Sequence, residues 1–228
     1  MEAAAVVERA KAEKWPDEEV VARVLQGETA LFEIIMRRYN QRLFRVALAI
    51  LRDEAEAEDV TQDAYVRAYQ HLDQFAGRSA FSTWLTRIAV HEALARAGRR
   101  RQLEDLEGIV MLKGEDIREL TSHLASPEQQ ASTGEVRKLL EAAILSLPEA
   151  YRTVLMLRDV EEMSTAETAS SLNLTEENVK VRLHRARALL RRELYNRAGS
   201  ARGDAFPFMG ARCDRIVRRV FERLARTG

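Results

Sequence analysis

The chain has 228 residues, 46% of them hydrophobic and 32% charged, and its 36 basic residues balance 36 acidic ones. A net charge of zero gives no overall attraction to nucleic acid, so any such binding depends on local patches. A single cysteine, Cys213, excludes an internal disulfide and, with four scattered histidines, argues against a structural zinc site. No segment approaches about eighteen uninterrupted apolar residues, and the acidic N-terminus lacks the basic start of a signal peptide. We therefore expect a cytoplasmic protein with no membrane insertion, metal or cofactor.

Apolar residues recur at three- and four-residue spacing along most of the chain, and no segment alternates with period two. This periodicity predicts an all-α fold. We expect helices over residues 17–26, 29–51 and 55–72, and another that starts near Ser82. The apolar face of the second helix should point into a core. It comprises Phe32, Ile35, Leu43, Val46, Ala47 and Ile50. Together these helices predict a small helical domain at residues 1–101.

Aromatic residues and arginines occur together between Phe75 and Arg101. Leu85, Ile88 and Ala89 recur at helical spacing, which predicts that they are core residues. For Phe75 and Trp84 two interpretations remain open. They pack inside the domain, or they form a platform for unstacked bases beside a cationic groove. The groove would be lined by Arg87, Arg96, Arg99, Arg100 and Arg101.

Residues 102–133 have weaker periodicity, with seven acids, two bases, two glycines and one proline. This composition predicts a linker. We prefer a solvated, flexible connector. The alternative is an acidic strap that occupies a basic channel of a partner.

Helical periodicity returns at Glu135, and residues 134–197 have the size of a small four-helix domain. Pro148 suits the start of a helix, where its missing N–H costs least. Ser164 and Glu167 have the spacing of a capping box, which marks another helix start. These signals predict a short helix after residue 164.

A tight turn and a basic helix follow that short helix. Asn173 tolerates a left-handed conformation, and Thr175 can cap the next helix. The buried stripe of the basic helix should comprise Val179, Leu183, Ala186 and Leu190. Its other face offers an amide and guanidinium groups that can pair with bases in a major groove. That face comprises Asn178, Lys180, Val181, Arg182, His184 and Arg185. The order of elements predicts a DNA-binding helix-turn-helix.

Other basic residues and the C-terminal extension have less specific interpretations. For Arg187, Arg191 and Arg192 we prefer a solubilising role or phosphate contact. Residues 196–210 read as a loop, and residues 213–226 within the extension 198–228 predict a short amphipathic tail helix. We prefer a helix packed on the second domain with Cys213 buried. A contact for a regulator and a redox-sensitive thiol are the alternatives.

The chain shows no Gly-rich phosphate loop, no metal-ligand spacing and no paired histidines with a carboxylate between them. His71, His91, His123 and His184 are better explained as surface or packing residues. We therefore expect no enzymatic activity.

Two blocks of sequence resemble a known family. The first runs from LFEIIMRRYNQRLFRVALAIL through EAEDVTQDAYVRAYQHLDQF to FSTWLTRIAVHEALARAGRRR, and the second from LPEAYRTVLMLRDVEEMSTAETASSL to VKVRLHRARALLRREL. In this order they resemble a bacterial extracytoplasmic-function (ECF) sigma factor, a sigma-70 family initiation subunit of RNA polymerase. The resemblance covers residues 30–194. It implies a nonenzymatic subunit that binds core polymerase, recognises minus-ten and minus-thirty-five promoter elements and promotes DNA melting.

The resemblance also implies which residues act. The acidic helix would dock on the clamp helices of the largest polymerase subunit through Glu58, Asp59, Val60, Gln62, Asp63, Arg67 and Ala68. The minus-ten element would be melted and its non-template strand read by Phe75, Arg78, Ser79, Phe81, Thr83, Trp84, Arg87, His91, Arg96, Arg99 and Arg100. The six helix-turn-helix residues named above would read the minus-thirty-five duplex.

The resemblance further implies a contact with the flap of the large polymerase subunits and a linker that lies in the active-site and RNA-exit channel. It also implies an anti-sigma factor that holds the protein inactive until a stress is sensed. The chain departs from the family at His91 and Ala95, where many members have Asn and then Asp. It departs also at Thr61, where an aliphatic residue is common, and at Asn173, where a turn glycine is frequent.

The alternative function is a stand-alone helix-turn-helix regulator whose N-terminal domain dimerises or senses a signal. A protein that sequesters a partner is the third.

Overall fold

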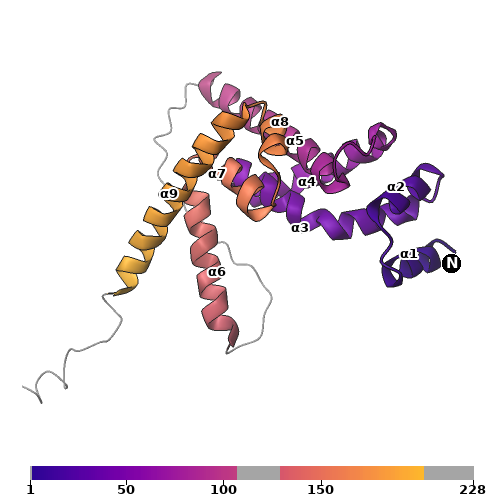
Figure 1. Ribbon diagram of the computed structural model, residues 1–228, viewed down its shortest axis with the longest axis horizontal. Coiled ribbons are helices and arrows are strands. Elements are labelled where there is room, and N and C mark those ends of the chain that lie inside the picture. The colour runs from indigo at the N-terminus through magenta and orange to yellow at the C-terminus, as the bar shows by residue number, and fades with distance from the viewer. Residues whose placement is uncertain (1, 107–128, 203–228) are drawn as a thin grey trace, which may run out of the picture. The chain divides into compact units, whose positions relative to one another are not determined.

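The computed structural model describes residues 2–106 and 129–202, and every regular element in these two ranges is a helix (Figure 1). The predicted all-α fold is therefore confirmed. The centre of the predicted linker and the predicted tail helix with Cys213 lie outside the described residues. Among the described residues, those up to Leu190 form one compact unit, and the last residues of the C-terminal helix, from Arg191 on, do not belong to it.

The N-terminal part of the chain forms five α-helices and two short 3-10 turns. Their bounds are α1 Glu2–Ala12, α2 Asp17–Leu25, η1 Thr29–Leu31, α3 Phe32–Leu51, α4 Glu54–Gln70, η2 Leu72–Gln74 and α5 Phe81–Leu106. Helix α1 was not predicted. Its sequence is rich in alanine, a strong helix former, and Val7 and Ala10 bury one face of it.

Helices α3, α4 and α5 pack against one another and carry most of the N-terminal core. All six residues predicted to point inward from α3 are buried. Leu85 and Ala89 on α5 are fully buried as predicted, whereas Ile88 is half-buried. The local periodicity of the sequence thus located this core correctly.

The α1–α2 junction is held by a buried tryptophan. The guanidinium carbons of Arg9 and Arg23 lie 5.1 and 4.1 Å from the ring centroid of Trp15. The indole N–H donates to Glu13, and Arg38 of α3 donates to the Trp15 carbonyl at 2.6 Å. These contacts tie the first two helices to α3.

Residues 129–202, the described C-terminal part, contain four α-helices and one π-helical turn. Their bounds are α6 Gln129–Ser146, α7 Glu149–Leu155, η3 Met156–Val160, α8 Thr165–Leu172 and α9 Glu176–Arg202. Both ends of the predicted linker are helical, because α5 continues to Leu106 and α6 already begins at Gln129. The predicted loop after Tyr195 was wrong for its first residues, which extend α9 to Arg202. Alanine and arginine there favour helix, and a single glycine costs only about 1 kcal/mol.

The predicted helix starts and turns are confirmed. Pro148 is the N-cap of α7. Ser164 Oγ accepts from the N–H of Glu167 at 3.1 Å, and the Glu167 carboxylate accepts from the N–H of Ser164 at 2.8 Å. Asn173 adopts the left-handed conformation with φ of 51°. The Thr175 hydroxyl accepts from the N–H of Asn178 at 3.2 Å, which caps α9.

The core of the helix-turn-helix is continuous with that of α3. One apolar cluster joins Val46 and Ile50 of α3 to Leu147, Val154 and Leu157 of the C-terminal part. Contacts between α3 and α7, α3 and η3, and α5 and α8 lie within the compact unit 1–190. The two predicted domains, 1–101 and 134–197, therefore bury part of their surfaces against each other.

A buried arginine anchors this contact. Arg152 of α7 is 2% exposed and donates to the main-chain carbonyls of Ala49 and Leu147, and to that of Ile50 at 3.4 Å. Burial lowers the pKa of its guanidinium to about 10. The charge is compensated by carbonyl dipoles at the C-terminal end of α3, where a cation is favoured.

We expect Ser164→Ala to lower the free energy of unfolding by about 1 kcal/mol, because it removes the hydroxyl of the capping box. Urea denaturation followed by circular dichroism measures this change. Ser170→Ala is the matched control, because Ser170 is exposed within α8. An equal loss in both variants would contradict the capping assignment.

Candidate functional site

The predicted polymerase-binding helix α4 has an exposed acidic face. Asp53 caps it by accepting from the N–H of Glu56 at 2.9 Å. Five of the seven predicted residues are exposed on it, namely Glu58, Asp59, Gln62, Asp63 and Arg67. Val60 and Ala68 are 1% and 0% exposed, so they support α4 from within.

Three of the acids of α4 are paired in three dimensions, although no base interrupts them in sequence. Arg96 of α5 lies 3.3 Å from a carboxylate oxygen of Asp59 and 3.3 Å from one of Asp63. Arg100 lies 3.2 Å from Glu56. Two residues predicted to bind polymerase are thus paired with a residue predicted to bind DNA.

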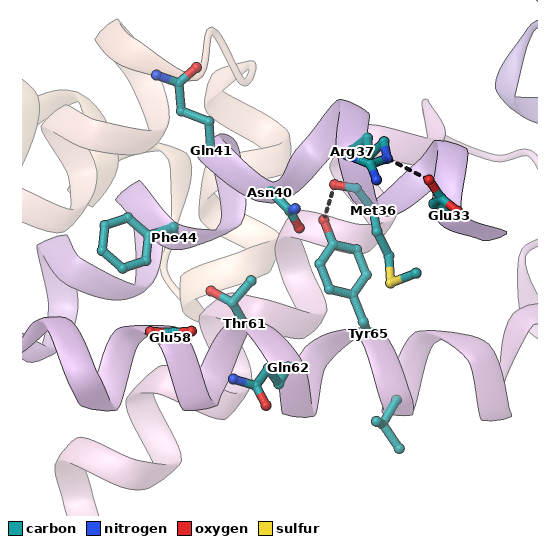
Figure 2. A pocket seen from close by; sticks show the side chains of 11 residues that line it. Glu33, Met36, Arg37, Asn40, Gln41, Phe44, Glu58, Thr61, Gln62 and Tyr65 are labelled. Atoms are coloured by element: carbon teal, nitrogen blue, oxygen red, sulfur yellow. Dashed lines mark hydrogen bonds and ion pairs between the residues drawn. The ribbon is translucent and has the colours of Figure 1, made fainter. Parts of the chain in front are cut away.

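A groove of about 740 Å³ runs between α3 and α4 (Figure 2). Its apolar part is formed by Met36, Phe44, Tyr65 and Val66. The Tyr65 hydroxyl donates to the carbonyl of Met36 at 3.1 Å, and burial raises its pKa. The remaining lining residues are polar, namely Glu33, Arg37, Asn40, Gln41, Glu58, Thr61 and Gln62. Two predicted polymerase-binding residues, Glu58 and Gln62, therefore line a groove whose apolar residues the sequence analysis missed.

The loop between η2 and α5 is built on an aromatic cluster. Ring centroids of Phe75 and Phe81 lie 5.1 Å apart in an edge-to-face arrangement, and Trp84 lies 5.7 and 5.5 Å from them. Phe81 is 1% exposed, whereas Phe75 and Trp84 are half-buried. Phe81 therefore anchors the loop, and the other two side chains are partly exposed. Gly77, with φ of 67°, makes the turn and has open space around it.

The predicted minus-ten residues differ in what surrounds them. Arg78, His91 and Arg99 are exposed, Ser79 and Arg87 are half-buried, and Arg96 and Arg100 form the ion pairs described above. Thr83 is only 4% exposed, and its hydroxyl donates to a carboxylate oxygen of Glu167 on α8 at 2.8 Å. Some residues of the predicted minus-ten surface are thus exposed, others form ion pairs, and Thr83 is buried.

Helix α9 presents the predicted face for the minus-thirty-five element. Val179, Leu183 and Ala186 are buried as predicted, and Leu190 is half-buried. Five of the six predicted DNA-reading residues are exposed and Arg182 is half-buried. Within the described part of the chain, the three basic residues among them form no ion pair. They are Lys180, Arg182 and Arg185.

Arg187 on the same helix is held differently. Its guanidinium makes two hydrogen bonds with the carboxylate of Asp159, at 2.9 and 2.6 Å, and Asp159 raises its pKa. This agrees with the preference for a role other than base reading. Helical periodicity cannot show that Arg187 is paired while Arg185 is not, because Asp159, the partner of Arg187, is 28 positions away in the sequence.

The interface residues between the two parts of the fold were also missed. The sequence predicts no tertiary contact for Arg152 or Glu161. For Glu167 it predicts only the capping box. The sequence gives one signal for such a role, the charged residue Arg152 shortly before the apolar run Val154 to Leu157.

Among the residues the structure describes, no group of histidine, cysteine or carboxylate side chains is arranged to hold a metal. No helix in the described ranges is long and apolar enough to cross a membrane.

Comparison with known proteins reproduces the two blocks found in the sequence. A family model for "Sigma-70 region 2" matches residues 35–103, and one for "Sigma-70, region 4" matches residues 137–190. The chain is 30% identical over 181 residues to the ECF RNA polymerase sigma factor SigW of Bacillus subtilis, which covers 76% of this chain and 94% of that protein. It is 33% identical over 178 residues to the ECF RNA polymerase sigma-E factor of Escherichia coli K12, with 77% and 92% covered.

A solved structure of CnrH in complex with the cytosolic domain of CnrY is also similar. Its TM-score is 0.52 at 25% sequence identity, over 84% of this chain and 99% of that one. The family resemblance inferred from the sequence is confirmed by these matches.

We expect Phe81→Ala to lower the free energy of unfolding by about 3–5 kcal/mol, because it empties a fully buried position. Phe75→Ala should cost less, since part of that ring is already exposed. Chemical denaturation of both variants measures the difference. A larger loss for Phe75→Ala would contradict the assignment of Phe81 as the anchor.

Proposed function

The chain belongs to the sigma-70 family of RNA polymerase sigma factors, in its extracytoplasmic-function branch, and from this premise we propose how its surfaces divide promoter recognition. It is an alternative sigma factor that directs RNA polymerase to promoters. In our proposal α4 and the adjoining groove bind core polymerase, the loop 75–81 with α5 reads and melts the minus-ten element, and α9 reads the minus-thirty-five element. The protein acts as a nonenzymatic subunit in the bacterial cytoplasm. The capped α9 with its exposed polar and basic face is the observation that carries the proposal.

The α4 surface suits a basic and partly apolar partner. Asp59 and Asp63 have side chains that are 64% and 58% exposed. Ion pairs between exposed groups contribute about 0–1 kcal/mol, so a basic helix of the polymerase can replace Arg96 at little cost. The adjacent groove supplies an apolar centre with a polar rim, which is the usual anatomy of a protein interface. We therefore propose that this surface binds the clamp helices of polymerase. The C-terminal helices would bind the flap.

The aromatic loop suits a single strand. Phe75 and Trp84 are partly exposed and can stack on an unpaired base, and Arg78 and Arg99 can contact phosphates. Phe81 keeps the loop ordered before DNA binds. An ordered loop lowers the entropic cost of capturing a base.

The α9 face suits the major groove of a duplex. Asn178 can pair with adenine, and Arg182 and Arg185 with guanine or phosphate. Because the Thr175 hydroxyl caps the first turn of α9 by accepting from the N–H of Asn178, that turn is already formed before it meets DNA. Such a recognition helix reads bases with its N-terminal residues.

We also propose an anti-sigma factor as a regulatory partner. The similar protein CnrH was solved in complex with the cytosolic domain of CnrY. This likeness supports a partner of the same class.

The decisive experiment is reconstitution with core RNA polymerase, followed by mapping of transcription starts across a genome. We expect starts preceded by two shared sequence elements, and protection of both elements only when polymerase is present. Specific binding of the chain alone to an inverted repeat would instead indicate a stand-alone regulator.

We expect the double substitution Asp59→Arg with Asp63→Arg to raise the Kd for core polymerase at least about a hundredfold, because it places two like charges against a basic surface. A fluorescence binding titration with purified core polymerase measures the change. The matched control is Glu18→Arg with Asp73→Arg, which reverses two exposed charges elsewhere. Unchanged affinity in the first variant would refute the docking assignment.

We expect Arg185→Ala to reduce transcription from promoters that depend on the minus-thirty-five element, with discrimination of about 1–3 kcal/mol at one base position. In vitro transcription from promoters with single-base changes measures it. Arg191→Ala should act equally on all sequences, because we assign that residue to phosphate or solvent. If both variants lost activity equally on every promoter, Arg185 would be a phosphate contact.

A further inference from the structure

We propose that Asp17 and Tyr39 are positioning residues that hold the loop 75–81 ready for promoter melting. Asp17 fixes the ring of Tyr39, and that ring supports Phe81 from within the domain. The inference rests on the proposed function only for the role of the loop. Neither residue belongs to the predicted minus-ten set, and Asp17 lies before residue 35, where the match to the region 2 model begins.

The carboxylate of Asp17 joins the first turn of α2 to α3. Its side chain is 17% exposed and accepts from two consecutive residues of α3, namely the guanidinium of Arg38 at 2.7 Å and the hydroxyl of Tyr39. A carboxylate is also favoured in the first turn of a helix, where N–H groups lack partners. Asp17 is therefore held in place independently of Tyr39 and offers its hydroxyl a fixed acceptor.

The hydroxyl of Tyr39 depends on this acceptor. Burial raises the pKa of Tyr39, and the hydrogen bond and negative charge of Asp17 act in the same direction. The hydroxyl therefore stays protonated and donates at neutral pH. Loss of the acceptor would leave a half-buried polar group unsatisfied, which costs more than removing both partners together. The ring would then turn toward water and away from its neighbours.

The ring of Tyr39 lies against the aromatic cluster of the loop. Its centroid is 6.2 Å from that of Phe81, and the two ring planes are inclined at 51°. The centroid of Phe81 is in turn 5.1 Å from that of Phe75 and 5.5 Å from that of Trp84. Aromatic rings attract one another at such distances and angles. Tyr39 thus supports the buried ring on which both rings assigned to base stacking are packed.

Helices α2 and α3 also hold the two ends of the loop. Helix α2 packs against η2, the turn that precedes the loop. Arg42, three residues after Tyr39 on α3, donates to the hydroxyl of Thr86 near the start of α5 at 2.9 Å. The two helices therefore form one frame around the loop, and Asp17 joins them.

The expected consequence of disturbing this frame is a defect confined to melting. Stacking on an unpaired base requires rings that are already in position, and supporting residues keep them there. A displaced loop would have to reorganise before it captures a base. Initial binding to duplex DNA would change little, because we assign it to α9 and to phosphate contacts.

The test separates promoter binding from promoter opening in polymerase reconstituted with the full-length chain. The promoter comes from the start-site mapping and carries the fluorescent base 2-aminopurine in the non-template strand of its minus-ten element. Fluorescence rises when this base leaves the stack, and its rate at several polymerase concentrations gives a binding constant and an opening rate. Asp17→Ala should lower the opening rate about tenfold and leave the binding constant unchanged. An unchanged opening rate, or equal losses in both constants, would overturn the proposal.

Two further variants test the hydrogen bond itself. Adding Tyr39→Phe to Asp17→Ala removes the unsatisfied hydroxyl, so the opening rate should return to within about twofold of the unsubstituted rate. Asp17→Asn keeps an acceptor oxygen for Tyr39 and should open promoters at nearly that rate. A purely structural role of Asp17 would not be rescued by the loss of a second polar group. A defect in Asp17→Asn as large as that in Asp17→Ala would assign the effect to the ion pair with Arg38 and refute the role of Tyr39.

Glu19→Ala is the matched control, because it removes another carboxylate of α2 from an ion pair, here with Arg23 at 3.4 Å. We expect its opening rate to equal that of the unsubstituted protein. Circular dichroism of each variant verifies that the helices remain. A loss in Glu19→Ala equal to that in Asp17→Ala would show a general effect of α2 and contradict the specific role of Asp17.

The position of the loop is also measured in the free chain. Fluorine NMR of protein labelled with fluorotryptophan gives a signal for Trp84, which is assigned by its loss in Trp84→Phe. This signal should shift in Asp17→Ala and return in the double variant with Tyr39→Phe, and an unmoved signal would refute the support. If the unsubstituted protein opens no promoter, the proposed function fails, whereas this spectrum still decides whether Asp17 holds the loop.

Discussion

The buried guanidinium of Arg152 is the interaction on which the described arrangement depends. It satisfies carbonyls at the end of α3 and in the segment that joins α6 to α7, so a single side chain links the N-terminal and C-terminal helices. A buried cation is tolerated only where several acceptors surround it. Its position therefore requires α3 and α7 to lie together, and the shared apolar cluster then closes around it.

A second constraint is the distribution of charge. The chain is neutral overall, and its acidic helix α4 is partly neutralised by arginines from α5. These pairs are exposed and hence weak, so a partner with a stronger field can exchange them. In contrast, Lys180, Arg182 and Arg185 on α9 have no ion-pair partner among the described residues. The exposed acids of α4 thus suit the proposed contact with polymerase, and the exposed basic face of α9 suits the proposed contact with DNA.

Local rules explain why the helix-turn-helix was predictable in detail. The capping box at Ser164, the left-handed Asn173 and the cap at Thr175 each depend on residues within three or four positions. The buried stripe of α9 likewise follows from helical spacing. The same reasoning missed the groove beside α4, because Met36 and Phe44 lie on a different helix from Tyr65 and Val66. The sequence also predicts a loop from residue 196, whereas the helix propensity of the neighbouring alanines and arginines extends α9 to Arg202 despite Gly199.

The sequence by itself determined the all-α class, the family, the helix starts and the faces of α3 and α9, since all of these follow from short-range periodicity, caps and ordered motifs. Only the tertiary structure decided which charges are paired and which are buried. Arg96 meets Asp59 and Asp63, Glu161 meets Arg42 and Arg45, and Thr83 meets Glu167. These partners lie about thirty to more than a hundred positions apart, and no periodic pattern encodes such distances. Ion pairing and desolvation depend on the final positions of both groups, so they emerge only when the helices pack.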